Sequence, residues 1–321
     1  MKSVPSRDFR SAWWLPSGHC QTLWAALARR EPLLALHRER FELADGDFLD
    51  LDWTDNNGTA VVLVLHGLEG SARSPYVRAL TRAVYRRGWR AACLHFRSCS
   101  GEPNRCSRLY HSGETGDLDA VVTSIRHRYP GLPLAVVGYS LGGNVLLKWL
   151  GEKRGGAPLA AAVAVSVPFR LDLAVARLNT GLSRIYQWWL LRSLRKKITA
   201  RVRAHPGLVS ARGLRRWQTL REFDEEVTAP LYGFSGADDY YRQASSLPYL
   251  RCIETPTLIL QATDDPFIPP TAIPAPEDLA HAITLEISHT GGHVGFVAGC
   301  LPGKARYWLD ERIPEYLSRY L

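Results

Sequence analysis

The chain has 321 residues, a mass of 35.9 kDa and an ordinary globular balance of 46% hydrophobic and 22% charged residues. This composition excludes a disordered or collagen-like chain. No apolar run approaches the ~18 residues needed to cross a bilayer, and the start lacks the continuous apolar stretch of a secretory signal. The six cysteines form no CxxC pair, which is typical of reduced thiols and indicates neither a disulfide framework nor a zinc site; they are Cys20, Cys93, Cys99, Cys106, Cys252 and Cys300. We therefore expect a cytoplasmic protein.

The net charge of +9 is unevenly distributed along the chain. Between Arg170 and Arg221 there are 13 Lys or Arg residues and one acid, Asp172, whereas the rest of the chain has 27 basic and 30 acidic residues. Outside this strongly basic segment the chain is slightly acidic. This charge distribution does not fit a nucleic-acid-binding fold. The basic segment could face anionic lipid, an anionic substrate or water.

Short apolar runs alternate with helical patterns, which is typical of a parallel sheet with crossover helices. A hairpin comes first, because two strand-like runs flank Asp45-Gly46, a pair that favours a tight turn. The expected strands are 36–43, 48–53, 61–67, 90–96, 133–140, 160–167, 257–262 and 283–288, and the expected helices are 76–88, 118–125, 141–150 and 306–320. These elements indicate an α/β fold with a mostly parallel central sheet flanked by helices.

After Phe169 the alternation stops and helical periodicity with heavy basic charge takes over. We interpret residues 1–168 and 250–321 as an α/β core and residues 169–249 as a helical cap insertion. Several side chains of the insertion fall at helical spacing and give one largely apolar face: Leu182, Ile185, Tyr186, Trp189 and Ser193. We expect this face to line an acyl pocket, and the basic side to face solvent or anionic lipid. We interpret the Trp188-Trp189 pair either as part of the hydrophobic core of the cap or as a lipid anchor.

The most informative stretch is Gly138-Tyr139-Ser140-Leu141-Gly142, a G-x-S-x-G between an expected strand and an expected helix. Glycines two residues either side permit the crowded backbone of a sharp strand-to-helix turn. The turn lifts the serine hydroxyl clear of the sheet, and the helix N-terminus stabilises negative charge that develops there. This context predicts Ser140 as a nucleophile.

A serine nucleophile needs hydrogen-bond donors for the oxyanion it creates. One is expected to be the backbone N–H of Leu141, and the other the N–H of Leu68, which follows an earlier strand in His66-Gly67-Leu68-Glu69-Gly70. His66 could itself be taken for the base. We interpret it instead as a residue that holds this loop by hydrogen bonds.

The base and the acid of such an enzyme follow the serine in sequence, which leaves four histidines, His205, His281, His289 and His293. His205 lies in the basic insertion and His281 in an expected helix. We favour His293, because Gly292 and Gly295 allow its loop to bring the imidazole over the serine, and expect His289 to pack in the loop. Zinc binding by His289 and His293 is rejected, since Gly291 and Gly292 make a shared helix face improbable.

The orienting acid is expected after the strand 257–262, where a carboxylate could accept the other ring N–H of the histidine. Asp265 precedes Pro266 and a rigid turn that fixes its direction, whereas Asp264 is interpreted as a turn or capping residue. The pair Asp238-Asp239 is a rival that fits a solvated loop better.

With these residues placed, the chain resembles the YheT-like group of α/β-hydrolases, which includes membrane-anchored mammalian phospholipases and yeast medium-chain ethyl-ester synthases. The resemblance runs from about Trp13 to the C-terminal helix and rests on the following segments: Gly18-His19-Cys20-Gln21-Thr22, 66–71, 96–104, Tyr110-His111-Ser112-Gly113-Glu114-Thr115, 138–144, Asp264-Asp265-Pro266 and 292–296. It implies an α/β-hydrolase fold and a Ser140–Asp265–His293 triad. The segments 97–101 and 110–114 could line the site or form polar loop structure.

These observations predict a serine hydrolase that cleaves carboxylic esters, either short- to medium-chain acyl esters or lipids, through an acyl-enzyme. Two alternatives stay open: an acyltransferase that makes esters with the same residues, and a non-catalytic α/β-hydrolase scaffold that binds ligands. Neither a cofactor nor a metal is implied. The expected partners are a small acyl ester and, through the basic cap, an anionic membrane, but no nucleic acid.

Overall fold

A nine-stranded sheet in the order β1-β9-β8-β7-β6-β4-β5-β3-β2 forms the centre of the molecule. The structure, a computed structural model, describes residues 2–5, 9–32, 34–204 and 217–321. The strands are β1 (Lys2–Pro5), β2 (Leu36–Glu42), β3 (Phe48–Thr54), β4 (Val61–Leu65), β5 (Arg90–His95), β6 (Leu134–Tyr139), β7 (Ala161–Val165), β8 (Thr257–Ala262) and β9 (Ile283–Ser288). Neighbouring strands are parallel from β1 to β5 in this order, whereas β3 pairs antiparallel with β5 and with β2. The expected mostly parallel α/β sheet is confirmed.

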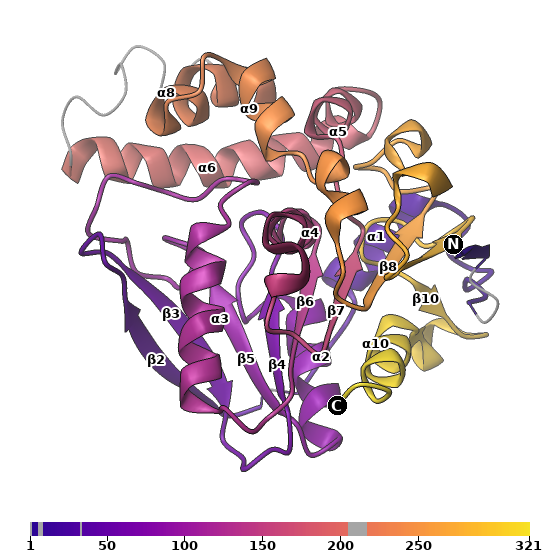
Figure 1. The fold of residues 1–321 in the computed structure, drawn as a ribbon. Coiled ribbons are helices and arrows are strands. Elements are labelled where there is room, and N and C mark those ends of the chain that lie inside the picture. Colours follow the sequence, from indigo (N-terminus) through magenta and orange to yellow (C-terminus); the bar gives the residue numbers. More distant parts are fainter. Residues whose placement is uncertain (1, 6–8, 33, 205–216) are drawn as a thin grey trace.

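Helices cover both faces of the sheet (Figure 1). Helices α3 (Gly116–Arg128) and α4 (Leu141–Lys153) pack on one face, and α2 (Pro75–Arg86) and α10 (Leu309–Leu317) on the other. Helix α1 (Gly18–Leu27) lies beside α2. The expected C-terminal helix over 306–320 is shorter than the sequence pattern indicates, because Arg306–Tyr307 form the short strand β11, which pairs with β10 (Val297–Ala298).

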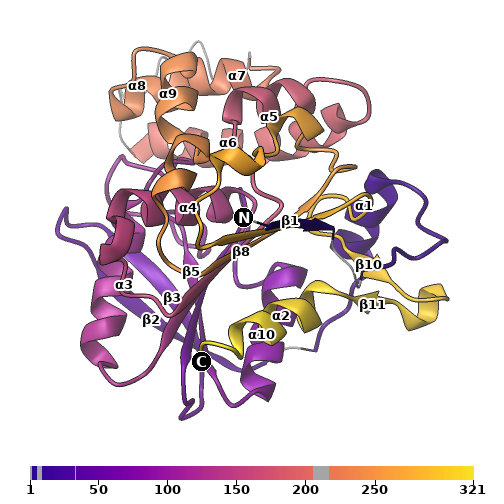
Figure 2. The ribbon, with the colours of Figure 1, turned by 45° about the vertical axis from the view of Figure 1, so that its right-hand side comes forward.

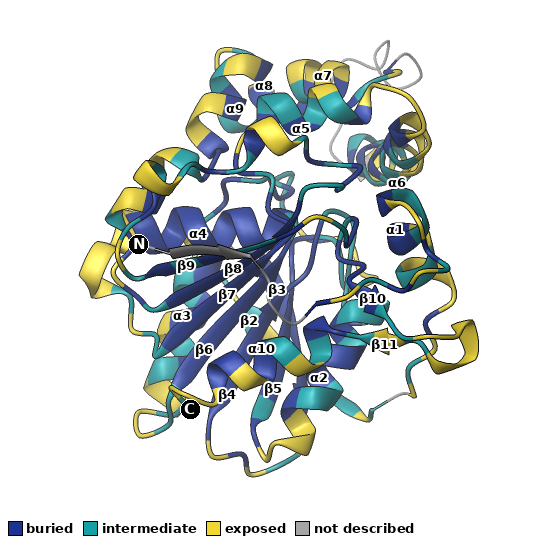
Figure 3. Cartoon of the chain, turned by 90° about the vertical axis from the view of Figure 1, so that its right-hand side faces the viewer, coloured by how far each residue is buried: buried dark blue, intermediate teal, exposed yellow. Residues whose placement is uncertain are grey.

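Strand β4 shows why the sheet carries continuous apolar runs. Val61, Leu63 and Leu65 pack with the core on the α3/α4 side, and the alternate residues Val62 and Val64 pack on the α2/α10 side. Because each parallel strand is covered on both faces, every position must be apolar. In Figure 3 the central strands are accordingly buried along their length.

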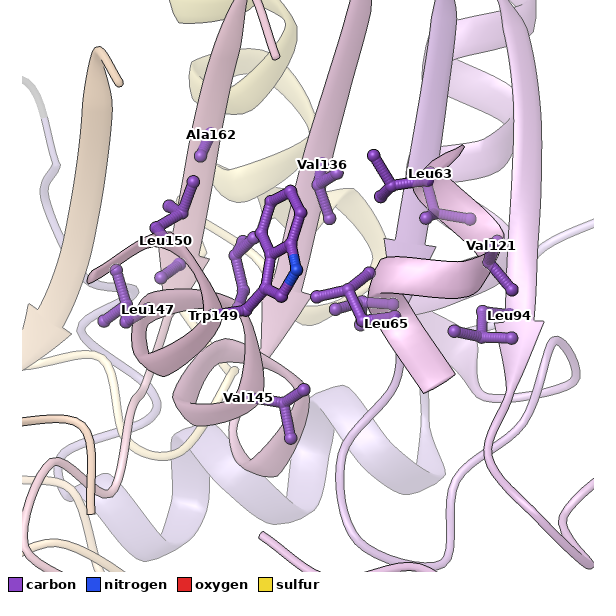
Figure 4. Packing of buried hydrophobic residues seen from close by; sticks show 14 of the residues in the cluster. Leu63, Leu65, Leu94, Val121, Val136, Val145, Leu147, Trp149, Leu150 and Ala162 are labelled. Atoms are coloured by element: carbon purple, nitrogen blue, oxygen red, sulfur yellow. The ribbon is translucent and has the colours of Figure 1, made fainter. Parts of the chain in front are cut away.

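Trp149 of α4 is a large side chain at the centre of the α3/α4 core. It lies among Val136, Leu65 and Leu150 (Figure 4), is 1% exposed, and donates its indole N–H to Asp119 Oδ1 at 3.0 Å. We expect Trp149→Ala to lower the free energy of unfolding by about 3–5 kcal/mol, because the cavity adds to the lost transfer energy. Trp149→Phe, which keeps an aromatic ring but loses the N–H donor, should lower the free energy of unfolding by less. Urea unfolding of both variants measures the difference, and equal losses would contradict the packing argument.

Between β7 and β8 the chain forms helices above the carboxyl-terminal edge of the sheet (Figures 1 and 2). They are α5 (Leu171–Leu178), α6 (Ser183–Ala204), α7 (Leu220–Phe223), the π-helical turn Asp224–Thr228, α8 (Ala229–Tyr232) and α9 (Ala237–Ala244). Their apolar side chains form small cores of their own. We propose that residues 169–249 act as one cap. The 3₁₀ turn Leu247–Cys252, at its end, packs against α4 of the core.

Candidate active site

Ser140 stands at the turn between β6 and α4 with φ 52° and ψ −118°. A serine rarely adopts this conformation, and the two flanking glycines make room for it. A Cβ on Gly138 would lie 2.5 Å from the carbonyl oxygen of Gly142, and a Cβ on Gly142 would lie 2.6 Å from that of His66. The G-x-S-x-G spacing is therefore a packing requirement of this turn.

His293 lies in the loop after β9, and its imidazole contacts the serine directly. Its Nε2 is 2.9 Å from Ser140 Oγ, and its Nδ1 is 2.9 Å from Asp265 Oδ2. With a proton on Nδ1, the imidazole donates to the carboxylate and its Nε2 accepts the serine proton. The structure thus brings together the three side chains that the sequence proposed as a triad.

The two adjacent aspartates after β8 have different partners. Asp265, 2% exposed, binds the ring of His293 and accepts the backbone N–H of Phe267 at 2.7 Å. Asp264 accepts the backbone N–H of Gly292 at 2.8 Å instead, and burial raises the pKa of its carboxyl. Asp264 therefore holds the loop, and Asp265 meets the imidazole.

The segment near the N-terminus also holds the histidine loop. Thr22 Oγ1 accepts the backbone N–H of His293 at 2.8 Å, and the Gln21 amide both accepts from and donates to the backbone of Val297 at 2.7 and 3.1 Å. Sequence reasoning noted Gly18–Thr22 only as part of the resemblance and assigned it no role. Nothing in the local spacing links residue 22 to residue 293, so only the fold shows this support.

The loop after β4 lies against the nucleophile, since a Cβ on Gly67 would be 3.2 Å from Ser140 Cβ. Tyr76 OH accepts the N–H of Gly67 at 2.9 Å and Tyr110 OH accepts the N–H of Glu69 at 2.8 Å. The N–H of Leu68, between them, donates to no other described residue. This leaves it available as the oxyanion donor proposed from the sequence, together with Leu141 at the start of α4.

His66 is fully buried and holds this loop, as expected. Its Nδ1 lies 2.7 Å from the carbonyl oxygen of Gly67 and its Nε2 accepts the N–H of Phe96 at 3.2 Å. Burial lowers the pKa of His66 to about 3, so the ring is neutral and both nitrogens are occupied. It has no free nitrogen with which to act as the base.

An aromatic stack covers the His293 imidazole. Phe267 stacks on it at 4.0 Å between centroids, Tyr186 of α6 stacks on Phe267 at 4.8 Å, and His19 of α1 stacks on Tyr186 at 5.7 Å. Tyr186 OH also lies 3.0 Å from His19 Nδ1. The stack connects the cap and α1 to the loop that carries His293, and Phe267 covers one face of the imidazole.

A cavity of 510 Å³ opens onto Ser140 and His293. Its walls are mostly apolar and come from α1, the loop after β4 and the cap. Among the residues that line them are Leu23, Leu27, Leu68, Val175, Trp189, Leu190, Leu194 and Phe223. Tyr110 and Ser112 of the segment 110–114 also line it. A cavity of this size and lining suits an apolar chain next to a reactive ester.

The segment 97–101 contributes structure at its first residue. Arg97, 2% exposed, donates to both carboxylate oxygens of Asp117 at 2.8 and 2.7 Å, and pairs with Asp47 at 3.1 Å. This buried network holds the loop between β5 and α3, with Asp117 of α3 as the ion-pair partner of Arg97.

The rival histidines and acids lie elsewhere. His289 is exposed, not packed in its loop, and His281 lies in a turn before β9 where the sequence pattern favoured a helix. Asp238 and Asp239 lie in the first turn of α9, not in a loop, and pair with Arg221 and Arg242. His205 lies outside the described residues. Within the described ranges, no group of three or more His, Cys, Asp or Glu side chains could hold a metal ion.

Helix α6 differs from its expected orientation. Tyr186 and Trp189 of the predicted apolar face line the cavity. Leu182 and Ile185 of that face are exposed to solvent, as is much of Trp189, so the face is only partly turned inward. On its basic side, Arg192 and Lys196 are exposed, whereas Lys197 is turned inward onto Glu69. Helical spacing alone did not reveal this, because it identifies the apolar positions of a helix and not which of them the rest of the fold covers.

Comparisons with known proteins give the family and the relatives of this chain. Residues 60–299 match a family described as alpha/beta hydrolase fold. The chain is 41% identical to YheT of Escherichia coli K12, named as an esterase, over 99% of this chain and 93% of that one. It is 30% identical to the mouse phospholipase ABHD3, over 98% and 79% of the two chains.

Solved structures show the same fold at lower identity. The Pyrococcus furiosus esterase Pf2001 superposes with a TM-score of 0.59 at 19% identity, covering 89% of this chain and 91% of that one. In the described part of this chain, no helix is long and apolar enough to span a bilayer.

Proposed function

The chain belongs to the α/β-hydrolase family and is a carboxylic ester hydrolase, and we propose that it works through Ser140, His293 and Asp265. The observation that carries this is the continuous hydrogen-bonded line from Ser140 Oγ through both ring nitrogens of His293 to the buried Asp265 carboxylate. Each member of that line has the partner that its role in acyl transfer requires.

In the first half-reaction, Ser140 Oγ attacks the ester carbonyl carbon while His293 Nε2 accepts the hydroxyl proton. The backbone N–H groups of Leu68 and Leu141 stabilise the oxyanion. His293 then returns the proton to the alcohol oxygen as the carbon–oxygen bond breaks, which leaves acyl-Ser140. In the second half-reaction, His293 deprotonates a water that attacks the acyl carbon. It then returns this proton to Ser140 Oγ as the bond between Oγ and the acyl carbon breaks and the acid leaves. Asp265 stabilises the imidazolium in both.

The substrate class follows from the cavity. Its apolar walls favour a short- to medium-chain acyl ester or a lipid ester, and relatives are named as a phospholipase from mouse and a monoacylglycerol lipase from yeast. A panel of p-nitrophenyl esters of increasing acyl length tests this, with Ser140→Ala as the background. We expect activity that rises with chain length until the cavity is filled. Activity confined to acetate would contradict an acyl pocket, and ethyl-ester formation in added ethanol would identify an acyltransferase.

We also propose that the protein docks on anionic membranes at the cavity mouth. The mouth patch consists of exposed apolar side chains of α1, of α6 and of the residue that precedes α6: Leu23, Leu27, Leu182, Ile185, Trp188 and Trp189. Leu27 is 80% and Trp189 65% exposed, and both also line the cavity, so the patch continues into the acyl site. Exposed Arg184 and Arg192 lie on the same helix. Aromatic and basic residues together suit an anionic interface.

Sedimentation with phosphatidylcholine vesicles containing phosphatidylglycerol tests the docking. We expect binding at low salt that weakens as salt rises, because surface charge is screened within about 8 Å at physiological ionic strength. The double variant Trp188→Ala, Trp189→Ala should release the protein, whereas Leu301→Ala, a control in the β10–β11 loop, should not. If wild type stays in the supernatant at low salt, the membrane proposal is wrong and the esterase proposal is untouched.

A reducing compartment remains our proposal for where the protein works. All six cysteines are free thiols, which suits a cytoplasm that holds thiols reduced.

A further inference from the structure

A lysine of the cap contacts the loop after β4, which carries the proposed oxyanion donor Leu68. Lys197 of α6 places its Nζ 2.8 Å from Glu69 Oε1, and the two side chains are 21% and 7% exposed. Burial lowers the pKa of Lys197, but Cys99 and Glu69 beside it raise it more, and the net direction is upward, which keeps the ammonium group charged. Glu69 immediately follows Leu68, the proposed oxyanion donor.

Glu69 is held by several contacts at once. Tyr110 OH donates to Glu69 Oε1 at 2.9 Å, Ser193 of α6 donates to Oε2, and the backbone N–H of Glu69 donates to Tyr110 OH at 2.8 Å. Its φ of 58° is uncommon for a residue with a side chain. Such a backbone persists only where its surroundings hold it, and here two of the three side chains that bind the carboxylate belong to the cap.

The rest of α6 is fixed to the core by different contacts. One turn further on, Arg201, 3% exposed, donates to Ser98 Oγ at 3.0 Å and to the carbonyl oxygen of Asn104. These contacts anchor the helix on the loop after β5, which Lys197 also contacts through Cys99 Sγ, 3.0 Å from its Nζ. Removing the Lys197 contact therefore tests the oxyanion loop without detaching the whole helix.

We infer that Glu69 is a positioning residue of the oxyanion hole and that its ion pair with Lys197 couples the placement of the cap to the placement of the Leu68 N–H. The inference rests on the proposed function. When α6 is seated, Lys197 and Ser193 hold the Glu69 carboxylate, and the Glu69 backbone holds the peptide next to the donor. When α6 is displaced, the loop loses this anchor and the hole is no longer preformed.

The test uses the full chain and the variants Lys197→Met, Glu69→Gln and their combination, with Lys196→Met as the matched control. Lys196 is the exposed neighbour on the same helix, so its loss changes the cap charge equally. For each protein we would measure kcat and KM on a p-nitrophenyl ester, inhibition by a trifluoromethyl ketone that forms an oxyanion on Ser140, and the melting temperature.

We expect each single variant to lose about ten-fold or more in kcat, as a partly misplaced oxyanion donor should, with KM within about two-fold. The trifluoromethyl ketone should weaken in parallel, which a merely structural role would not produce. The double variant should lose no more than the worse single variant, because both remove one interaction. Lys196→Met should retain wild-type values, and Lys197→Arg should restore part of the lost rate.

Wild-type kcat and inhibitor affinity in Lys197→Met, in a protein that still depends on Ser140, would overturn the coupling and leave the esterase proposal standing. Additive losses in the double variant would overturn it as well. A wild type that neither hydrolyses esters nor reacts at Ser140 would instead overturn the proposed function. If Lys197→Met melts below the assay temperature, Ser193→Ala, which removes the other contact from α6 to Glu69, decides by the same readouts.

Discussion

Replacing Ser140 with alanine is expected to lower kcat for ester hydrolysis by about 10³-fold or more, by analogy with triad knockouts in other serine hydrolases. The expectation follows from the elbow geometry, which presents Oγ at 2.9 Å from His293 Nε2 in an apolar cavity. Alanine fits the same backbone without a hydroxyl, so the fold should persist. Hydrolysis rates and melting temperatures of the two proteins measure the two effects separately.

A covalent probe checks the same residue independently of any chosen substrate. A fluorophosphonate should label the wild type and leave Ser140→Ala unlabelled, and peptide mass analysis should place the adduct on Ser140. Labelling that survives in the variant would show that another residue is the nucleophile. Absence of labelling in a folded wild type would favour a binding scaffold.

Replacing His293 with alanine is expected to be almost as damaging, because the serine loses the base that accepts its proton. Asp265→Asn should cost less than His293→Ala if the carboxylate acts mainly by orienting the ring and stabilising the imidazolium. Steady-state kcat/KM on one ester, with circular dichroism as the check on folding, separates these losses.

The chain supplies a matched control for each of these residues. His289 is exposed, so His289→Ala should retain nearly full activity. Asp264 binds the Gly292 backbone, so Asp264→Asn should cost some stability and much less rate than Asp265→Asn. If either control proved more damaging to kcat in a folded protein than its neighbour, the assignment of base or acid would be wrong.

The sequence by itself determined the order of the strands from β2 to β9 and of the helices α2, α3 and α4 between them, because apolar runs and helical periodicity are local patterns. It did not predict the short strands β1, β10 and β11 or the helix α1. The 61–65 run has to be a strand buried on both faces, and the hairpin around Asp45-Gly46 follows from turn chemistry. The G-x-S-x-G segment is equally local, since its glycines are needed within the turn itself. These parts were predictable because each depends on residues that lie close together in the chain.

The tertiary structure alone decided which distant residues meet. Thr22 reaches the backbone of residue 293, and Lys197 reaches Glu69, contacts between residues more than 120 positions apart in sequence. The tertiary structure also decides the orientation of α6, because the loops packed against this helix determine which of its side chains are buried. Hydrogen bonds and ion pairs of this kind act only over a few ångströms, and the fold, not spacing along the chain, sets which groups come that close.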